Sequence, residues 1–254
     1  MRIVIKIGTS TLTHSTGNLN IRRVEEMCKT ISDVKNAGHE VIMVSSGAIA
    51  MGIGKLGMSE KPSDISTKQA AAAVGQCELM YTYDKLFCEY NHTVAQLLIT
   101  GEDIKNKDRY CHFSNTLNRL LELGVIPIIN ENDTVSTDEI VIGDNDTLGA
   151  EVAKSVKADL LMVLSDINGL YTADPHREKD AKLISKVTDL GSEIYALAGG
   201  KGSKLGTGGM VTKLKAAKIC MDCGCDMIII NGSDPYNIYR AIDGTDVGTR
   251  FTVK

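Results

Sequence analysis

Residues 3–10 read Ile-Val-Ile-Lys-Ile-Gly-Thr-Ser, a short apolar run with one lysine that ends on a glycine and two hydroxyl side chains. Further continuous apolar runs occur at residues 41–44, 125–129, 160–164 and 227–230. Continuous runs, unlike alternating ones, are typical of strands that are buried on both faces of a sheet. The sequence therefore predicts a largely parallel sheet.

The intervals between these runs show the helical spacing of apolar residues. Such spacing occurs at residues 21–37, 67–90, 113–123, 147–157 and 211–222. Glycines typical of helix C-termini follow three of these stretches, at Gly38, Gly124 and Gly224. Alternating strands and helices require right-handed crossovers, so we predict an α/β fold, an open three-layer α/β/α sandwich around a mostly parallel sheet.

The chain is expected to form a single domain with two lobes, at about residues 1–150 and about residues 151–254. Neither an internal repeat nor a charged linker divides it into independent domains. Residues 135–143 interrupt the alternation of strands and helices, and we expect a small antiparallel excursion there.

Composition and charge disfavour several classes of protein. The net charge is −4, from 28 Lys and Arg against 32 Asp and Glu, whereas a general nucleic-acid binder would be basic. There is no signal-peptide pattern and no apolar run of the roughly 18–20 residues that cross a bilayer. We therefore expect a cytoplasmic protein without nucleic-acid or membrane partners.

The seven cysteines are odd in number and lack the regular spacing of a disulfide framework, which favours reduced thiols. Cys220, Cys223 and Cys225 form a C-x-x-C-x-C cluster that has two interpretations. It could be part of a metal site, or three small thiols at the end of a helix and the turn into the next strand. We favour the second interpretation, because no fourth Cys or His lies nearby in the sequence.

Polar and glycine-containing segments follow the predicted strands, where open α/β sheets bind their ligands. They lie at residues 6–10, 45–48, 130–133, 143–146 and 165–166. A further segment, residues 199–209, holds six glycines in eleven residues and leads into a helix from Met210 with Lys213 in its first turn. Although a flexible linker has the same composition, the helix N-terminus favours a phosphate-binding loop. It is not a Walker loop, since no G-x-x-x-x-G-K-[ST] occurs.

Two motif matches are rejected. Residues 52–57 match the dinucleotide-binding pattern G-x-G-x-x-G but lie beyond the turn after the second strand, which disfavours a Rossmann dehydrogenase. Residues 144–146 resemble the start of a calcium-binding loop, but Leu148 and Ser155 stand where that loop needs oxygen ligands.

Taken together, the motifs resemble those of the glutamate 5-kinases, which belong to the amino acid kinase family. The matching segments are residues 6–10, 45–50, 129–133, 143–146, 169–175 and 206–213. The resemblance implies ATP-dependent phosphorylation of the γ-carboxylate of L-glutamate, the first step of proline biosynthesis. The chain departs from the family pattern at Ser165, where bacterial relatives often have threonine. The resemblance also implies a kinase domain without the C-terminal RNA-binding-like domain of many relatives.

The resemblance assigns phosphoryl transfer to a small group of residues. Lys6 and Lys213 would neutralise charge on the transferring phosphoryl group, and Asp146 would fix both ammonium groups. Backbone N–H groups at Gly8 and Gly47 would support the phosphoryl oxygens. The alternative for Lys6 is a snorkelling strand lysine, which its position just before Gly8 disfavours.

The resemblance also implies a site for ATP and Mg²⁺ in the C-terminal lobe, with Mg²⁺ held mainly by the phosphates and no dedicated protein ligands. The residues assigned to this site are Lys6, Ser165, Asp166, Thr207, Gly208, Gly209, Met210, Val211, Thr212 and Lys213. The N-terminal lobe would bind glutamate.

The chemistry of the acceptor can be argued from charge. A carboxylate with a pKa of about 4.3 is already ionised at neutral pH, so it needs no general base, and no histidine lies in the matching motifs. The α-ammonium group of free glutamate would be held by Asp133 with Asn145, and Asn130 is a further candidate. Ser46 would bind the carboxylate side. An N-acetylated or phosphorylated acceptor lacks this cation and is disfavoured, although Asp138 and Asp144 are equally well explained as turn-capping residues.

Two other functions stay open at this point. One is a different carboxylate kinase of the family, for N-acetylglutamate or carbamate, and the other is a catalytically silent nucleotide-binding sensor. The resemblance also implies feedback inhibition by proline, a homodimer or homotetramer, and coupling to glutamyl phosphate reductase.

Overall fold

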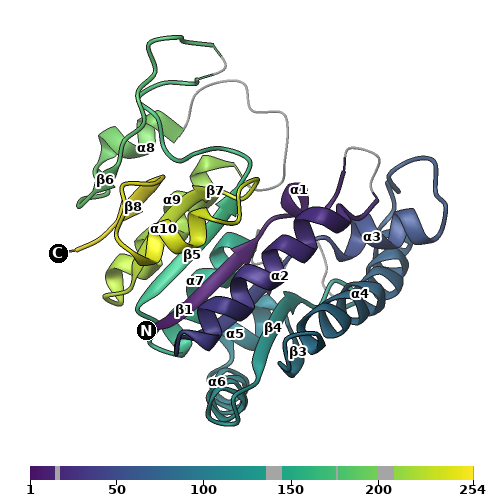
Figure 1. Cartoon of the computed structure of the whole chain (residues 1–254). Coiled ribbons are helices and arrows are strands. Elements are labelled where there is room, and N and C mark those ends of the chain that lie inside the picture. Colours follow the sequence, from purple (N-terminus) through teal and green to yellow (C-terminus); the bar gives the residue numbers. More distant parts are fainter. Residues whose placement is uncertain (15–17, 136–144, 176, 199–208, 254) are drawn as a thin grey trace.

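The computed structural model describes residues 1–14, 18–135, 145–175, 177–198 and 209–253. Within these ranges the chain forms a three-layer α/β/α sandwich around one eight-stranded sheet (Figure 1). The order of the strands is β3-β4-β2-β1-β5-β7-β8-β6. The predicted fold class is therefore confirmed.

Six neighbouring strands of the sheet, from β3 at one edge to β7, pair in parallel. They are β1 (Arg2–Ile7), β2 (Glu40–Ser45), β3 (Val94–Ile99), β4 (Ile126–Glu131), β5 (Leu160–Ser165) and β7 (Asp226–Asn231). At one edge β8 (Thr249–Phe251) runs antiparallel to β7, and the short β6 (Lys186–Val187) pairs with β8. Strands β4 and β5 are buried along their whole length, as their apolar runs predict, and the buried part of β4 also includes the polar Asn130 and Glu131 at its end.

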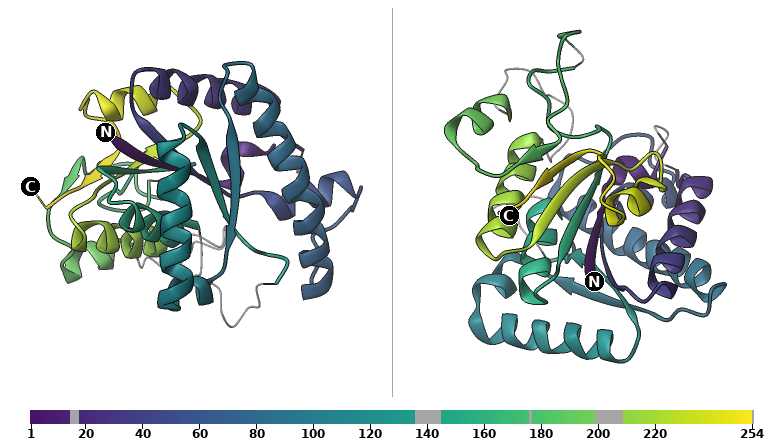
Figure 2. Two further views of the ribbon diagram at one scale, coloured as in Figure 1. Left: turned by 90° about the horizontal axis from the view of Figure 1, so that it is seen from below. Right: turned by 60° about the vertical axis from the view of Figure 1, so that its left-hand side comes forward.

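Helices cover both faces of the sheet (Figures 1 and 2). One face is covered by α2 (Ile21–Asn36), α3 (Ala48–Lys55), α4 (Ile65–Cys88) and α10 (Asn237–Ile242), and the other by α6 (Lys107–Glu122), α7 (Asn145–Ser155) and α9 (Met210–Asp222). The remaining helices are α1 (Thr9–Leu12), α5 (Gly101–Lys105) and α8 (Ser192–Ala198). In β1, Val4 joins the core under one layer while Ile3 and Ile5 join the core under the other, because successive side chains alternate between the faces.

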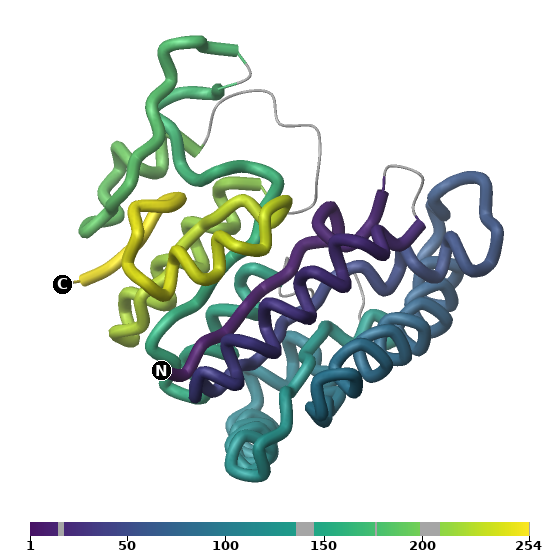
Figure 3. The backbone as a smooth tube through the Cα atoms, in the orientation of Figure 1, coloured from purple at the N-terminus to yellow at the C-terminus, as the bar shows by residue number. Residues whose placement is uncertain are grey.

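The path of the chain brings distant segments together at one end of the sheet (Figure 3). Strands β1, β2, β4 and β5 all end there, since they are parallel, and α7 and α9 begin near these ends. This is the edge at which open α/β sheets bind ligands. Among the described residues, no helix is both long and apolar enough to span a bilayer.

The structure corrects several predicted bounds. The predicted strand 125–129 extends to Glu131, and the predicted helix 113–123 already begins at Lys107, where the side chain of Asn106 caps it by accepting from the backbone of Asp108 and Arg109. Gly38, Gly124 and Gly224 adopt positive φ angles of 93°, 74° and 77°, as expected of helix C-termini. The predicted excursion at 135–143 lies outside the described residues except for Val135.

The sequence did not predict β3, the short strands at the other edge, or α3. Helix α3 contains Gly52 and Gly54 of the rejected dinucleotide pattern, so these glycines lie inside a helix and not in a phosphate-binding turn. A Cβ atom at Gly52 would clash with the backbone of Ala71, and one at Gly75 would clash with the backbone of Ala48. The glycines therefore allow α3 and α4 to cross in backbone contact.

Candidate active site

A buried cluster of three charged side chains lies at the carboxyl end of β1. Nζ of Lys6, from β1, is 2.7 Å from Oδ1 of Asp146, and Nζ of Lys213, from α9, is 3.0 Å from Oδ2 of the same carboxylate. Asp146 is fully buried, and the two lysines are 8% and 5% exposed. Segments separated by most of the chain thus bring two cations to one anion, which leaves the cluster with a net positive charge.

The environment of Asp146 determines its ionisation. Burial raises the pKa of its carboxyl, but the charges of Lys6 and Lys213 and their hydrogen bonds outweigh burial, and the pKa is lowered. The hydroxyl of Thr212 lies 3.3 Å from Oδ2 of Asp146 and donates to the carbonyl of Gly209 at 2.7 Å. Asp146 therefore stays ionised and can hold both ammonium groups in place.

Two predicted glycines lie at turns beside the cluster. Gly8 precedes α1, and a Cβ atom there would be 3.7 Å from Nζ of Lys6. Gly47 precedes α3 with a φ of 101°, a left-handed conformation that favours glycine. Because neither residue carries a side chain, the backbone is open to close approach at both turns.

A chain of hydrogen bonds joins three of the predicted acceptor-binding residues to a fourth residue from α4. Nδ2 of Asn145 donates to Oγ of Ser46 at 2.7 Å and to Oδ1 of Asn130 at 3.1 Å. Nδ2 of Asn130 in turn donates to Oε1 of Gln76 at 3.0 Å. We call Ser46, Asn145, Asn130 and Gln76 the amide chain.

Sequence analysis did not identify Gln76. Its side chain is 8% exposed, and its neighbours on the same face of α4 are the buried Ala72, Gly75 and Leu79. A polar residue in an otherwise apolar helical stripe was the available signal.

Asp133 lies just beyond the end of β4 and is partly buried. Burial and the nearby charge of Glu131 raise its pKa to about 6. Within the described ranges it forms no hydrogen bond to Ser46, Asn130 or Asn145. Its carboxylate is therefore destabilised in the free protein, and a bound cation would stabilise it.

The residues predicted to bind ATP are partly described. Ser165 ends β5, and its hydroxyl donates to Oδ1 of the next residue, Asp166, at 3.2 Å. Helix α9 begins at Met210, as predicted, and its N-cap residue Gly209 provides no side-chain hydrogen bond. Its first backbone N–H groups and positive dipole end are therefore suited to an anion.

Val211 and Thr212 lie in the first turn of α9, before Lys213. Thr207 and Gly208 lie outside the described residues. No group of three or more His, Cys, Asp or Glu is placed to hold a metal ion in the part of the chain that the structure describes.

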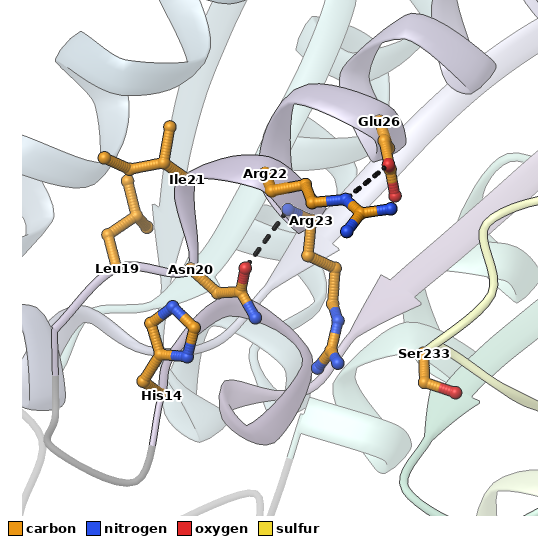
Figure 4. A pocket seen from close by; sticks show the side chains of 8 residues that line it. All are labelled: His14, Leu19, Asn20, Ile21, Arg22, Arg23, Glu26 and Ser233. Atoms are coloured by element: carbon orange, nitrogen blue, oxygen red, sulfur yellow. Dashed lines mark hydrogen bonds and ion pairs between the residues drawn. The ribbon is translucent and has the colours of Figure 1, made fainter.

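The structure also has a hollow of about 530 Å³ at the N-terminus of α2 (Figure 4). Arg22 and Glu26, which both line it, form an ion pair at 3.0 Å, and Arg23 donates to the carbonyl of Ser10 at 3.3 Å. None of the described residues that line it belongs to the amide chain or to the cluster of Lys6, Asp146 and Lys213, which we call the lysine cluster. The hollow is therefore separate from the predicted site.

Comparison with known proteins identifies the family. The sequence model of the "Amino acid kinase family" matches residues 1–231. The chain belongs to the amino acid kinase family. This amino acid kinase resembles several proteins named glutamate 5-kinase: it is 53% identical to that of Clostridium tetani, over 98% of this chain and 93% of that protein. It is 50% identical to that of Clostridium perfringens, over 100% and 96% of the two chains.

A third glutamate 5-kinase, from Caldanaerobacter subterraneus, is 51% identical over 99% of this amino acid kinase and 68% of that protein. Solved structures are similar in fold at lower identity. An isopentenyl phosphate kinase has a TM-score of 0.70 at 17% identity, covering 99% of this chain and 100% of that one. The carbamate kinase from Giardia lamblia bound to AMP-PNP has a TM-score of 0.68 at 19% identity, covering 100% and 98%.

Proposed function

We propose that this amino acid kinase transfers the γ-phosphoryl group of ATP to the γ-carboxylate of L-glutamate, giving L-glutamyl 5-phosphate and ADP, the first step of proline biosynthesis. The names of its relatives at about half identity support this activity. The structural observation that carries the proposal is that one turn of α7 contributes a residue to each of the two groups of side chains. Asn145 and Asp146, consecutive in α7, belong to the amide chain and to the lysine cluster respectively.

The lysine cluster would stabilise the charge of the transferring phosphoryl group. Lys6 and Lys213 approach from different elements, and Asp146 holds both ammonium groups before a substrate arrives, so little reorganisation is needed during the reaction. Their burial strengthens the interaction, because a charge acts more strongly where water is excluded. The N–H groups of Gly8 and Gly47 would add donors to the phosphoryl oxygens.

The amide chain and Asp133 would hold the acceptor. Asp133 would bind the α-ammonium group with Asn145 and Asn130, and Ser46 would bind the carboxylate side. Because the γ-carboxylate is ionised at neutral pH, the residues have to position a nucleophile and do not have to remove a proton.

ATP would bind on the side of β5 and α9. The proposed residues are Ser165, Asp166, Thr207, Gly208, Gly209, Met210, Val211, Thr212 and Lys213, with Lys6 reaching the transferring group. The N-terminus of α9, where the N-cap residue Gly209 has no side chain that could cap the helix, supports a phosphate position there. We propose Mg²⁺ as the metal ion, which would supply positive charge to the phosphate oxygens.

The proposed function is tested by offering one purified protein several acceptors. L-glutamate, N-acetyl-L-glutamate, carbamate and no acceptor would be compared with MgATP. ADP release would be measured by a coupled assay, and the acyl phosphate would be trapped with hydroxylamine. We expect a γ-glutamyl hydroxamate from glutamate alone. A hydroxamate from N-acetylglutamate but not from glutamate would refute the assignment of Asp133, and ADP release from none of them would favour a nucleotide sensor.

The proposal has further parts that the resemblance supports. Residues up to about 150 would form the glutamate-binding lobe and the later residues the ATP-binding lobe. The enzyme would act in the cytoplasm as a homodimer or homotetramer. Proline would inhibit it, and its unstable product would pass to glutamyl phosphate reductase.

A further inference from the structure

We propose that Gln76, on α4, is a positioning residue that fixes the orientation of the acceptor-binding amides of Asn130 and Asn145. The inference rests on the proposed function and deepens it, because it concerns the site assigned to glutamate. Gln76 acts through Asn130 and not through contact with the reacting atoms. Four observations carry the inference: two backbone contacts, the burial of the amide chain, and the helix crossing that holds α4.

The first observation fixes the direction of the Asn130 amide. The backbone N–H of Glu131 donates to the side chain of Asn130 at 2.9 Å. Since an N–H group can only donate, the atom facing it is Oδ1, and Nδ2 is the atom that faces Gln76. Gln76 must then present its oxygen, Oε1, at 3.0 Å.

The second observation fixes the Asn145 amide in the same way. The carbonyl oxygen of Ser45, which can only accept, lies 3.3 Å from Nδ2 of Asn145. Oδ1 of Asn145 is thus turned away from this contact, and no group in the described ranges donates to it. Since Ser46 accepts from Asn145, its own hydroxyl proton is free to donate.

The orientation of the amide chain gives the site its chemical polarity. Asn145 presents an oxygen, which suits an ammonium group, and Ser46 presents a hydroxyl proton, which suits a carboxylate. A reversed Asn145 amide would present two N–H donors where the substrate also has donors. The direction of these hydrogen bonds therefore favours an amino acid with a free ammonium group.

Burial makes Gln76 necessary for this orientation. Asn130 is 2% exposed and Gln76 is 8% exposed, so water cannot readily replace a lost acceptor. Without Oε1 of Gln76, Nδ2 of Asn130 would be a buried donor without an acceptor, which is unfavourable. Rotation of the Asn130 side chain would relieve it, but would also withdraw Oδ1 from Asn145.

The crossing of α3 and α4 holds the two ends of the amide chain in one frame. Gly75, next to Gln76, packs so closely that a Cβ atom would clash with the backbone of Ala48, the first residue of α3. Ser46 lies two residues before this helix begins. The position of Gln76 relative to Ser46 is therefore set by backbone contact between rigid helices and not by flexible side chains.

The test compares Gln76→Met, which keeps the size of the side chain and removes the acceptor, with Gln76→Glu, which keeps an acceptor. Gln96→Met, at an exposed position of β3, is the matched control. Steady-state constants would be measured by hydroxamate formation. We expect Gln76→Met to raise KM for glutamate about tenfold, with KM for ATP and kcat changed less than about threefold. Gln76→Glu and the control should stay within about threefold of the unaltered chain.

Each outcome decides the proposal. An unchanged KM for glutamate in Gln76→Met, or an equal rise of the constants for glutamate and ATP, would overturn it in favour of a general packing role. If Gln76→Met does not fold, Gln76→Glu still decides, because a tenfold rise in its KM for glutamate would contradict the acceptor role. If the unaltered chain forms no γ-glutamyl hydroxamate, the proposed function fails instead, so the two failures are distinguishable.

Discussion

The raised pKa of Asp133 makes a quantitative prediction about how the binding of glutamate depends on pH. A pKa of about 6 means that Asp133 is almost fully ionised at pH 7.5 and about one-tenth ionised at pH 5. If only the ionised form binds the α-ammonium group, KM for glutamate rises about tenfold between these values. Glutamate itself contributes little, because its γ-carboxyl has a pKa of about 4.3 and is still mostly ionised at pH 5.

The assay measures KM for glutamate from pH 5 to pH 8 at saturating MgATP, in the unaltered chain and in Asp133→Asn. At pH 7.5 the variant loses a charge-assisted hydrogen bond of about 1.5–3 kcal/mol, which is roughly a ten- to hundredfold rise in KM. Its KM should then be flat down to about pH 5. A flat profile in the unaltered chain, or a step near pH 6 that persists in Asp133→Asn, would refute the assignment.

The raised pKa of Asp133 also predicts that its ionised carboxylate lowers the free energy of unfolding, although it strengthens the binding of glutamate. A carboxyl whose pKa rises on folding, from 3.8 to about 6, binds its proton more tightly in the folded state. It therefore leaves stability unchanged below about pH 3.8, lowers it as the pH rises towards 6, and has a constant effect above that. Asp133→Asn should raise the free energy of unfolding by about 1–3 kcal/mol at pH 7.5, the lower part of the range allowing for partial exposure. Denaturant unfolding at pH 4 and pH 7.5 would measure it, and an equal gain at both would contradict the argument.

Other substitutions test the cluster and the helix crossing. Lys6→Gln and Lys213→Gln should each lower kcat at least a hundredfold and change KM for glutamate less than about threefold; a larger effect on KM than on kcat would contradict their role at the phosphoryl group. Asp146→Asn leaves two buried cations without an anion, so it should abolish activity and lower the free energy of unfolding by about 3–5 kcal/mol, and a stable variant would count against the cluster. Gly75→Ala should destabilise the protein by about 2 kcal/mol or more in thermal unfolding. Gly191→Ala, whose added Cβ meets among the described residues only a side-chain oxygen of Asp189 at 3.7 Å, should not.

The strands at the centre of the sheet were predicted well, because a strand that is buried on both faces has a continuously apolar sequence. The runs that gave β1, β2, β4, β5 and β7 are continuous and apolar for this reason. Strand β3 was not predicted because it is an edge strand with the exposed Gln96 in its middle. Its sequence shows neither the continuous apolar pattern of a buried strand nor an alternating pattern. Helix α3 was not predicted because Gly52 and Gly54 are of a residue type that is typical of loops. Close packing of α3 on α4 nevertheless requires a glycine at position 52.

The residues of the candidate site were also predicted only in part. The convergence of Lys6, Asp146 and Lys213 was expected from the family resemblance, and the placement of ligand-binding residues at strand ends follows from parallel topology. Gln76 could not be found in this way. Its proposed role depends on a contact with Asn130, 54 residues away in the sequence, and a polar residue in the apolar stripe of α4 does not by itself reveal that partner.

The joining of the two subsites in α7 bears on how the reacting groups are aligned. Asn145 and Asp146 are adjacent in a helix, so covalent geometry would fix the offset between the proposed acceptor position and the lysine cluster. Helix α7 in turn lies directly on the sheet, because a Cβ atom at Gly149 would be 3.5 Å from Cβ of Lys6 and 3.3 Å from Leu161. Errors in alignment of about 1 Å can reduce rates a hundredfold. If the proposed function is right, placing both subsites on one turn of a closely packed helix would make the distance between nucleophile and phosphoryl group insensitive to the conformation of the surrounding loops.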